Sequence, residues 1–302
     1  MSTEQKVKGK RSERAQPYDK GHRRKQPGNQ SSSAAKKYDD CSPIVQAFYT
    51  YQADLDKKHD RYERLVKLSR DVTIESKRVI FLLQRVSGSE DEEAENLLKQ
   101  AREKLHELRQ SKCRLIAREL AGEDPYQFLR AYSPGIQEYI EAVTLLHYLQ
   151  DETLVSLAEV SKDLHFKLEP DDNCDDSGTA VDDPEKSVSV FVSPVDYMLG
   201  IADLTGELMR IAINCIGSGD ITSPFKLCVF LRTVHRAFMS FENSSRELSR
   251  KLTVLRQSLK KVETACYTLQ VRGSEIPTHM LIDVLKTDPG PYTADHGEML
   301  DN

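Results

Sequence analysis

The longest stretch of the chain without a proline, residues 44–124, contains only two glycines, Gly88 and Gly122. Apolar residues recur along it at the spacing of one face of an α-helix, beginning with Phe48, Tyr51, Leu55, Tyr62 and Val66. This pattern predicts two long helices with a break near Ser87–Asp91. A β-sandwich or β-barrel needs turn residues far more often, so this stretch favours a helical fold.

Prolines that follow a serine mark the starts of further helices. A serine N-cap followed by proline is a helix start signal, and it occurs at Ser133-Pro134, Ser193-Pro194 and Ser223-Pro224. We also expect a shorter helix after Pro125, a long helix over about 246–270 and a short one at 277–286. The run Val188–Val192 is strand-like but has no evident partner. These segments predict an all-α fold, a bundle of about seven helices.

Three polar segments flank or interrupt the predicted domain. Residues 1–30 hold nine Lys or Arg and three acids, and residues 169–185 hold eight acids and no base. Such compositions bury too little apolar surface to fold. We therefore predict a disordered basic arm over 1–40, a helical domain over 41–286 with a disordered acidic loop at about 169–187, and a disordered tail over 287–302.

The basic arm contains two clusters, Lys8–Arg11 and Arg23–Lys25, spaced like a bipartite nuclear import signal. This spacing predicts a protein of the nucleus and cytoplasm, and the alternative is a nonspecific basic tail. The first 25 residues lack the apolar core of a secretory signal. No apolar run approaches the roughly 18 residues of a membrane span, so no membrane partner is expected. Six cysteines without a CxxC pair indicate reduced thiols.

The helix predicted to begin at Pro194, and to end at Gly217–Gly219, carries a narrow polar stripe. At about 100° per residue, one side of it holds Asp196, Asp203, Glu207, Arg210 and Asn214. The rest of its surface is almost entirely apolar, so the stripe is expected to be buried. Asp196 is explained by a capping box with Ser193. Because Arg210 cannot neutralise both remaining acids, a further cation is expected there.

A second set of acids stands on the helix predicted to begin at Ser133. Glu138 and Glu141 are one turn apart, so they share a face, and their neighbours are apolar. If this helix faces the other one, four carboxylates converge. Oxygen ligands without His or Cys predict a Mg²⁺ site, with Mn²⁺ as the alternative, whereas a di-iron site would need Glu-x-x-His pairs. The competing interpretation is an ion network at an interface with a partner protein.

Four stretches carry a resemblance to a known family. They are His59–Arg85, GIQEYIEAV at Gly135–Val143, SPVDYMLGIADLTGELMR at Ser193–Arg210, and Lys261–Leu281. Together they resemble the TRAX branch of the translin family, over about residues 43–285. The resemblance implies a seven-helix bundle that assembles with translin into a closed hetero-oligomeric shell, and it maps the metal-binding catalytic acids onto Glu138, Glu141, Asp203 and Glu207.

The same resemblance implies the activity. The complex would be a Mg²⁺-dependent endoribonuclease that binds single-stranded RNA, with single-stranded DNA as a second ligand. It would promote activation of the RNA-induced silencing complex (RISC) by degrading the nicked passenger strand, and it would process tRNA fragments. RISC components would then be partners beside translin. The alternative is a non-enzymatic scaffold, or nuclear-targeting partner, of translin in a nucleic-acid-binding complex.

RNA phosphates would be held by basic side chains, so binding should weaken with salt. The candidates are Lys57, Arg61, Arg64, Arg246 and Arg250. For each of them the alternative is a solvated charged face with weak ion pairs.

Overall fold

The computed structural model describes residues 42–167 and 187–272. The chain divides into two compact units, residues 1–51 and 52–302. The described part of the first unit is only the beginning of one helix, so the packing below concerns the second unit. The arm 1–40, most of the acidic loop, the helix expected at 277–286 and the tail 287–302 lie outside the described residues.

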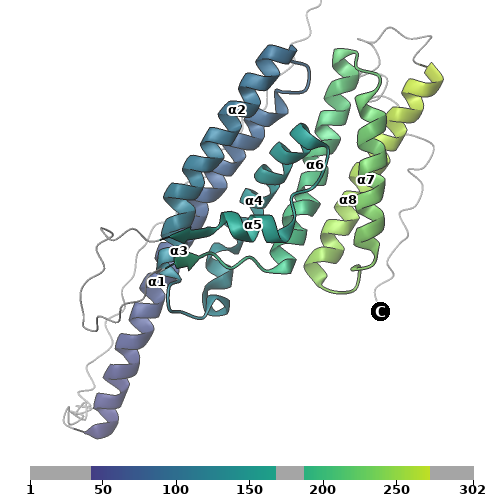
Figure 1. Cartoon of the computed structure of the whole chain (residues 1–302). Coiled ribbons are helices and arrows are strands. Elements are labelled where there is room, and N and C mark those ends of the chain that lie inside the picture. Colours follow the sequence, from purple (N-terminus) through teal and green to yellow (C-terminus); the bar gives the residue numbers. More distant parts are fainter. Residues whose placement is uncertain (1–41, 168–186, 273–302) are drawn as a thin grey trace, which may run out of the picture. The chain divides into compact units, whose positions relative to one another are not determined.

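Helices make up nearly all of the described chain (Figure 1). They are α1 Pro43–Gln84, α2 Asp91–Leu108, α3 Arg114–Glu119, α4 Pro125–Asp151, α5 Leu157–Asp163, α6 Pro194–Ser218, α7 Ser223–Met239 and α8 Arg246–Arg272. A π-helical turn at Arg109–Cys113 joins α2 to α3 without a break, so the described part contains seven separate helical segments. An all-α bundle was predicted, and it is confirmed.

Within the second unit, α4 lies between α1 and α6. After the turn that follows Gln84, α2 runs back along α1, and α6, α7 and α8 lie side by side (Figure 1). Close packing requires small residues at two points on α4 and α6. A Cβ added at Gly135 would lie 2.6 Å from the Ser69 carbonyl oxygen, and one added at Gly200 would lie 2.7 Å from Ile140 Cγ2.

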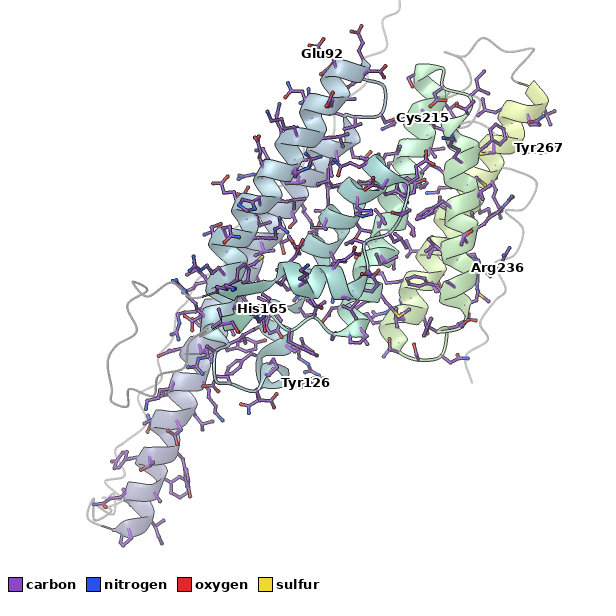
Figure 2. The ribbon with its side chains drawn as sticks, in the orientation of Figure 1. Glu92, Tyr126, His165, Cys215, Arg236 and Tyr267 are labelled. Atoms are coloured by element: carbon purple, nitrogen blue, oxygen red, sulfur yellow. The ribbon has the colours of Figure 1, made fainter. Side chains whose placement is uncertain are left out.

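Apolar side chains fill the core and polar side chains lie on the surface, as expected for amphipathic helices. The core contains fully buried side chains such as Tyr139 and Leu204. Figure 2 shows Glu92 and Arg236 on the surface of α2 and α7. Some large apolar side chains are exposed as well, including Tyr267 at 69%. No described helix combines the length and the apolarity that a membrane crossing requires.

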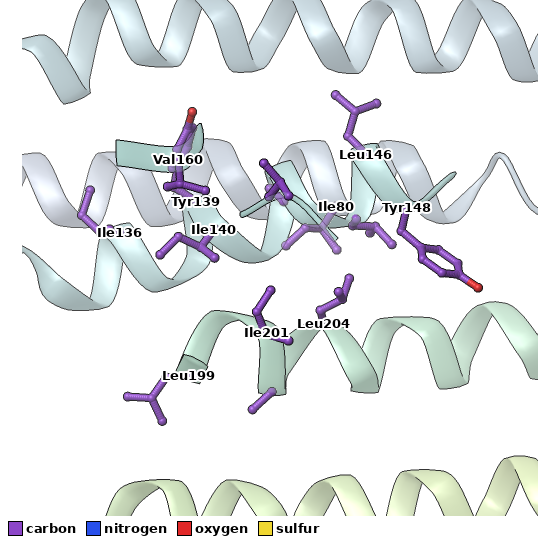
Figure 3. Packing of buried hydrophobic residues seen from close by; sticks show 14 of the residues in the cluster. Ile80, Ile136, Tyr139, Ile140, Leu146, Tyr148, Val160, Leu199, Ile201 and Leu204 are labelled. Carbon is purple, nitrogen blue, oxygen red and sulfur yellow. The ribbon is translucent and has the colours of Figure 1, made fainter. Parts of the chain in front are cut away.

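The core continues into the contact between α4 and α6. Figure 3 shows Ile140 of α4 and Ile201 of α6 in the space between these two helices. Both side chains are buried. The two helices that were predicted to carry the acidic residues therefore pack directly against each other.

The prediction that Ser133-Pro134 opens a new helix is wrong. Pro134 lies inside the continuous helix α4. Proline lacks the N–H that would donate to the carbonyl four residues earlier, but α1 contacts the peptide groups on either side of Pro134. The buried Ser69 hydroxyl donates to the Tyr132 carbonyl at 3.3 Å and accepts from the Gly135 N–H at 3.0 Å. Contact with α1 therefore supports the helix where its own hydrogen bonding is weakened.

The expectation that the strand-like run Val188–Val192 has no partner is also wrong. Strand β2, Ser187–Ser189, pairs antiparallel with β1, His165–Lys167, and Phe166 stands opposite Val188. The two strands come together across the acidic segment, and β1 is too short to show a strand pattern in the sequence. The inward-facing Phe166 and Val188 extend the core.

Other local predictions are confirmed. The break between the first two helices falls at residues 85–90, and α6 ends at Ser218 and is capped by Gly219, which adopts a left-handed conformation with φ of 90°. The four described cysteines, Cys113, Cys215, Cys228 and Cys266, are free and buried.

The α4–α6 contact yields a first prediction. Gly200→Ala should lower the free energy of unfolding by about 1–3 kcal/mol, because the new methyl group overlaps Ile140 and the Gln137 carbonyl. Gly206→Ala, in the same helix, is the matched control. A Cβ at Gly206 meets nothing within 4 Å, and alanine is favoured over glycine inside a helix by roughly 0.5–1 kcal/mol. Urea unfolding of both variants measures the difference, and equal effects would contradict the close contact.

Candidate functional site

The structure brings the four predicted carboxylates together at the contact between α4 and α6. Glu138 and Glu141 project from α4, and Asp203 and Glu207 from α6. The cluster is graded in depth: Glu141 is 7% exposed, whereas the side chain of Asp203 is 33% exposed. It therefore has a buried end and an end that opens to solvent.

The pKa shifts of these carboxylates show that the four groups influence one another electrostatically. Burial raises the pKa of Glu141 to about 8, together with the negative charges of Glu138, Asp203 and Glu207, while Lys251 opposes the shift. Burial likewise raises the pKa of Glu138, and Lys77 opposes this. The ionised form of Glu141 is thus disfavoured by its surroundings unless positive charge is added.

Two lysines partly neutralise the carboxylates, and one of them, Lys251, contacts the acidic stripe of α6, where a cation was expected. Lys77 of α1 lies 3.7 Å from Glu138 Oε2, and Lys251 of α8 forms an ion pair with Asp203. Sequence reasoning missed both. Lys251 has no distinguishing signal, because α8 is rich in charged residues.

Glu207 has a separate set of partners. Arg210, one turn later, donates to Glu207 Oε1 at 2.8 Å, as the sequence allowed. Gln84 of α1 donates from Nε2 to Glu207 Oε2 at 2.7 Å. Gln84 was also missed, although it stands seven residues after Lys77 and so on the same side of α1. Four helices therefore contribute to the site.

Glu141 differs from the other three acids. It forms no hydrogen bond or ion pair with any described residue, although it is buried. Leaving an ionised carboxylate buried without a partner is costly. A divalent cation with oxygen ligands is the kind of group that would satisfy it.

The four carboxylates have the donor chemistry that a divalent cation needs, but their side chains are not arranged around a common metal position. Within residues 42–167 and 187–272, no group of three or more His, Cys, Asp or Glu side chains is arranged to hold a metal ion. Two of the four carboxylates are instead turned to the ammonium groups of Lys77 and Lys251. The donor set suits Mg²⁺ or Mn²⁺, and binding either ion would require these two lysines to move.

Asp196 joins α4 to α6 next to the cluster. It is buried and accepts hydrogen bonds from the side chains of Ser133 and Gln137 on α4 and from the Ser193 hydroxyl at 2.6 Å. Ser193 in turn accepts from the Asp196 N–H and caps α6. Asp196 therefore fixes the register of the two helices that carry the acids.

The five basic residues predicted to hold RNA separate into two groups. Arg64 makes a two-pronged contact with Glu119, at 2.8 and 3.0 Å. Arg61 pairs with Glu123 and lies 5.8 Å from the centre of the Phe128 ring. These two arginines have partners within the fold. The remaining three are exposed and form no ion pair with a described residue: Lys57, Arg246 and Arg250.

The fold and the site together define an all-α bundle whose central helix pair carries a buried cluster of carboxylates. The sequence pattern of the Translin family matches residues 60–273, and the chain belongs to this family.

Known relatives fall on the two branches of that family. The chain is 49% identical to Translin-associated protein X of Mus musculus, over 82% of this chain and 86% of that protein. It is 30% identical to the Translin-associated protein X homolog of Schizosaccharomyces pombe, over 77% and 90%. It is 24% identical to Translin of Homo sapiens, over 76% and 94%. The predicted similarity to the TRAX branch is confirmed.

Solved structures support the fold. The crystal structure of apo-NeC3PO superimposes with a TM-score of 0.53, at 20% identity, covering 72% of this chain and 94% of that one. The structure of the AfC3PO–duplex RNA complex gives a TM-score of 0.50, at 20% identity, covering 76% and 100%. At these identities the likeness concerns the fold alone.

The burial of Glu141 gives a prediction for stability without metal. In the folded chain its pKa is about 8, against an ordinary value of 4.5. The folded state therefore binds the proton more tightly, and the contribution of Glu141 to stability falls as pH rises from about 4.5 to 8. Glu141→Gln does not titrate, so in EDTA its free energy of unfolding should exceed that of the wild type by about 1 kcal/mol or more at pH 8. The two should be closer at pH 5.

Denaturant unfolding across this pH range measures the effect. Glu95→Gln is the control, because Glu95 is an exposed glutamate on α2. Parallel pH profiles for the wild type and Glu141→Gln would show that Glu141 is not held in a charge-disfavouring environment.

Proposed function

We propose that this chain is the catalytic subunit of a Mg²⁺-dependent endoribonuclease that it forms with translin, and that the complex cleaves single-stranded RNA. One observation carries the proposal: Glu141 is buried without a partner among three other carboxylates. A scaffold helix would not need four acids at a helix–helix contact. The relatives named Translin and Translin-associated protein X support a translin-type assembly. RNA is proposed as the ligand, and AfC3PO, which shares the fold, was solved in complex with duplex RNA.

The proposed roles follow from position. Glu138, Glu141, Asp203 and Glu207 would hold the cation. Bound there, a divalent cation lowers the pKa of water and neutralises charge that develops on a phosphodiester. Asp203, at the open end, is the acid nearest to solvent, and Glu141, at the closed end, has no competing partner. Asp196 keeps α4 and α6 in register, so that the four carboxylates face one another.

The wider role is part of the same proposal. In cells, cleavage by the complex would degrade nicked passenger strands during activation of RISC and would process tRNA fragments. Single-stranded DNA would be a second ligand. The two basic clusters, Lys8–Arg11 and Arg23–Lys25, would direct the chain to the nucleus as well as the cytoplasm, and both lie outside the described residues.

A second candidate function is supported by a specific observation. Lys77 and Lys251 already pair with two of the carboxylates, and the described residues contain no ready-made group of metal ligands. On this alternative the acids are a structural ion network, and the chain is a non-enzymatic partner of translin.

Cleavage of RNA separates the two functions. The chain co-expressed with translin should cleave a labelled single-stranded RNA in Mg²⁺ and not in EDTA. Glu141→Ala should lower the rate by about 100-fold or more, because a metal ligand is removed. Asp151→Asn, at the exposed end of the same helix, is the control and should keep full activity. Equal cleavage by the wild type and Glu141→Ala, with assembly intact, would favour the scaffold.

RNA binding should depend on the exposed arginines at the start of α8. Arg246→Gln with Arg250→Gln should weaken binding and reduce the slope of log K against log salt by about 0.7 for each phosphate that is no longer neutralised. Lys99→Gln, an exposed change on α2, is the control. Fluorescence anisotropy at several salt concentrations gives the slopes. An unchanged slope in the double variant would show that these arginines do not bind the RNA.

A further inference from the structure

Two ammonium groups stand at the acidic cluster, and neither has a role in the proposed chemistry so far. Lys77 Nζ lies 3.7 Å from Glu138 Oε2, and Lys251 pairs with Asp203. One lysine thus serves an acid of α4 and the other an acid of α6. The lysines come from α1 and α8, two helices that flank the acid-bearing pair.

Lys77 is more exposed to solvent than the acid that it contacts, and Lys251 is as exposed as its partner. The side chain of Lys77 is 56% exposed, and that of its partner Glu138 is 19% exposed. Lys251 and Asp203 share the open end of the cluster, each at 33%. A ligand that enters from solvent therefore meets the lysines as well as the carboxylates. Glu141 is more deeply buried and forms no hydrogen bond or ion pair with a described residue.

A divalent cation and these ammonium groups would compete for the same oxygens. Charges of like sign held a few ångströms apart repel strongly where water is partly excluded. Binding of a cation by Glu138 and Asp203 would therefore release both lysines. Lysine has a long flexible stem and a compact charge, so it can change partners without movement of the helix.

We propose that Lys77 and Lys251 are internal counter-ions of the acidic cluster, which a divalent cation displaces and which then bind phosphates of the RNA. This inference rests on the proposed function, since it needs both the metal and the RNA. It adds two residues to the site and explains why two of the carboxylates are paired with ammonium groups. The competing explanation is that each lysine has a structural role only and holds two helices together through its ion pair.

The two explanations differ in the sign of a metal-binding effect. If the lysines are displaced counter-ions, Lys77→Met and Lys251→Met should each bind Mn²⁺ more tightly than the wild type, by about threefold or more, because a competing charge is gone. If the lysines have a structural role only, their removal should leave Mn²⁺ affinity unchanged or weaken it. Isothermal titration with Mn²⁺ on the full chain in complex with translin measures this directly.

RNA binding provides the second readout. In the same Mn²⁺ buffer, each lysine variant should bind a phosphorothioate single-stranded RNA, which resists hydrolysis, more weakly. The slope of log K against log salt should fall by about 0.7 for each lysine removed. Tighter metal binding together with weaker RNA binding is the expected combination, and general loosening of the fold would weaken both.

Matched controls exist on the same helices. Lys67→Met on α1 and Lys261→Met on α8 each lie ten residues from the test position, are exposed and form no ion pair with a described residue. Both should bind Mn²⁺ as the wild type does. Lys251→Arg keeps the charge and should stay close to the wild type in Mn²⁺ affinity, which guards against a packing effect of methionine.

The outcomes distinguish a failure of the role proposed for the two lysines from a failure of the proposed nuclease function. If neither the wild type nor the lysine variants bind Mn²⁺, the proposed nuclease function fails. If the wild type binds Mn²⁺ and the lysine variants bind it equally or less well, the inference alone is overturned. Tighter Mn²⁺ binding with unchanged RNA binding also overturns it, because the released lysines would not be reaching phosphate.

Discussion

A methyl group added at Gly200 would lie 2.7 Å from Ile140 and 2.9 Å from the Gln137 carbonyl, so α4 and α6 approach each other as closely as glycine allows. The carboxylates of Glu138 and Asp203 stand on these two helices, close to that contact. Their mutual effect on the pKa of Glu141 depends on this short distance. The site is therefore a consequence of helix packing, and a looser contact would leave four separate solvated acids.

The close approach of α4 and α6 causes repulsion between the carboxylates, and the fold neutralises it only in part. Like charges are brought together where water is scarce, and this raises the free energy of the folded state. Lys77 and Lys251 offset part of it at the open end of the cluster. Gln84 and Arg210 satisfy Glu207, but no described residue forms a hydrogen bond or an ion pair with Glu141. The incomplete neutralisation is concentrated on one buried residue, Glu141, and titratable groups with strongly shifted pKa values cluster at functional sites.

The helical fold and the acid-bearing faces could be predicted from the sequence because both depend on local periodicity. The stripe on α6 was visible since its acids interrupt an otherwise apolar helix. What failed depended on contacts between distant segments. Pro134 looks locally like a helix start, but it lies inside α4, where Ser69 of α1 binds the neighbouring Tyr132 carbonyl and Gly135 N–H. The partner of the strand near Val188 lies across the acidic segment. Lys251 is one of many charges on α8 until the fold places it beside Asp203.

The same dependence on distant segments links the site to the stability of the bundle. In the unfolded chain the acids and lysines are separate and hydrated, so the repulsion around Glu141 exists only after α1, α4, α6 and α8 have packed. Any cation that binds the folded cluster and not the unfolded chain shifts the folding equilibrium toward the folded state. Occupation of the site and integrity of the helix packing are thus thermodynamically coupled. A substitution such as one at Asp196, which touches no proposed metal ligand, would weaken cation binding by loosening the register of α4 and α6.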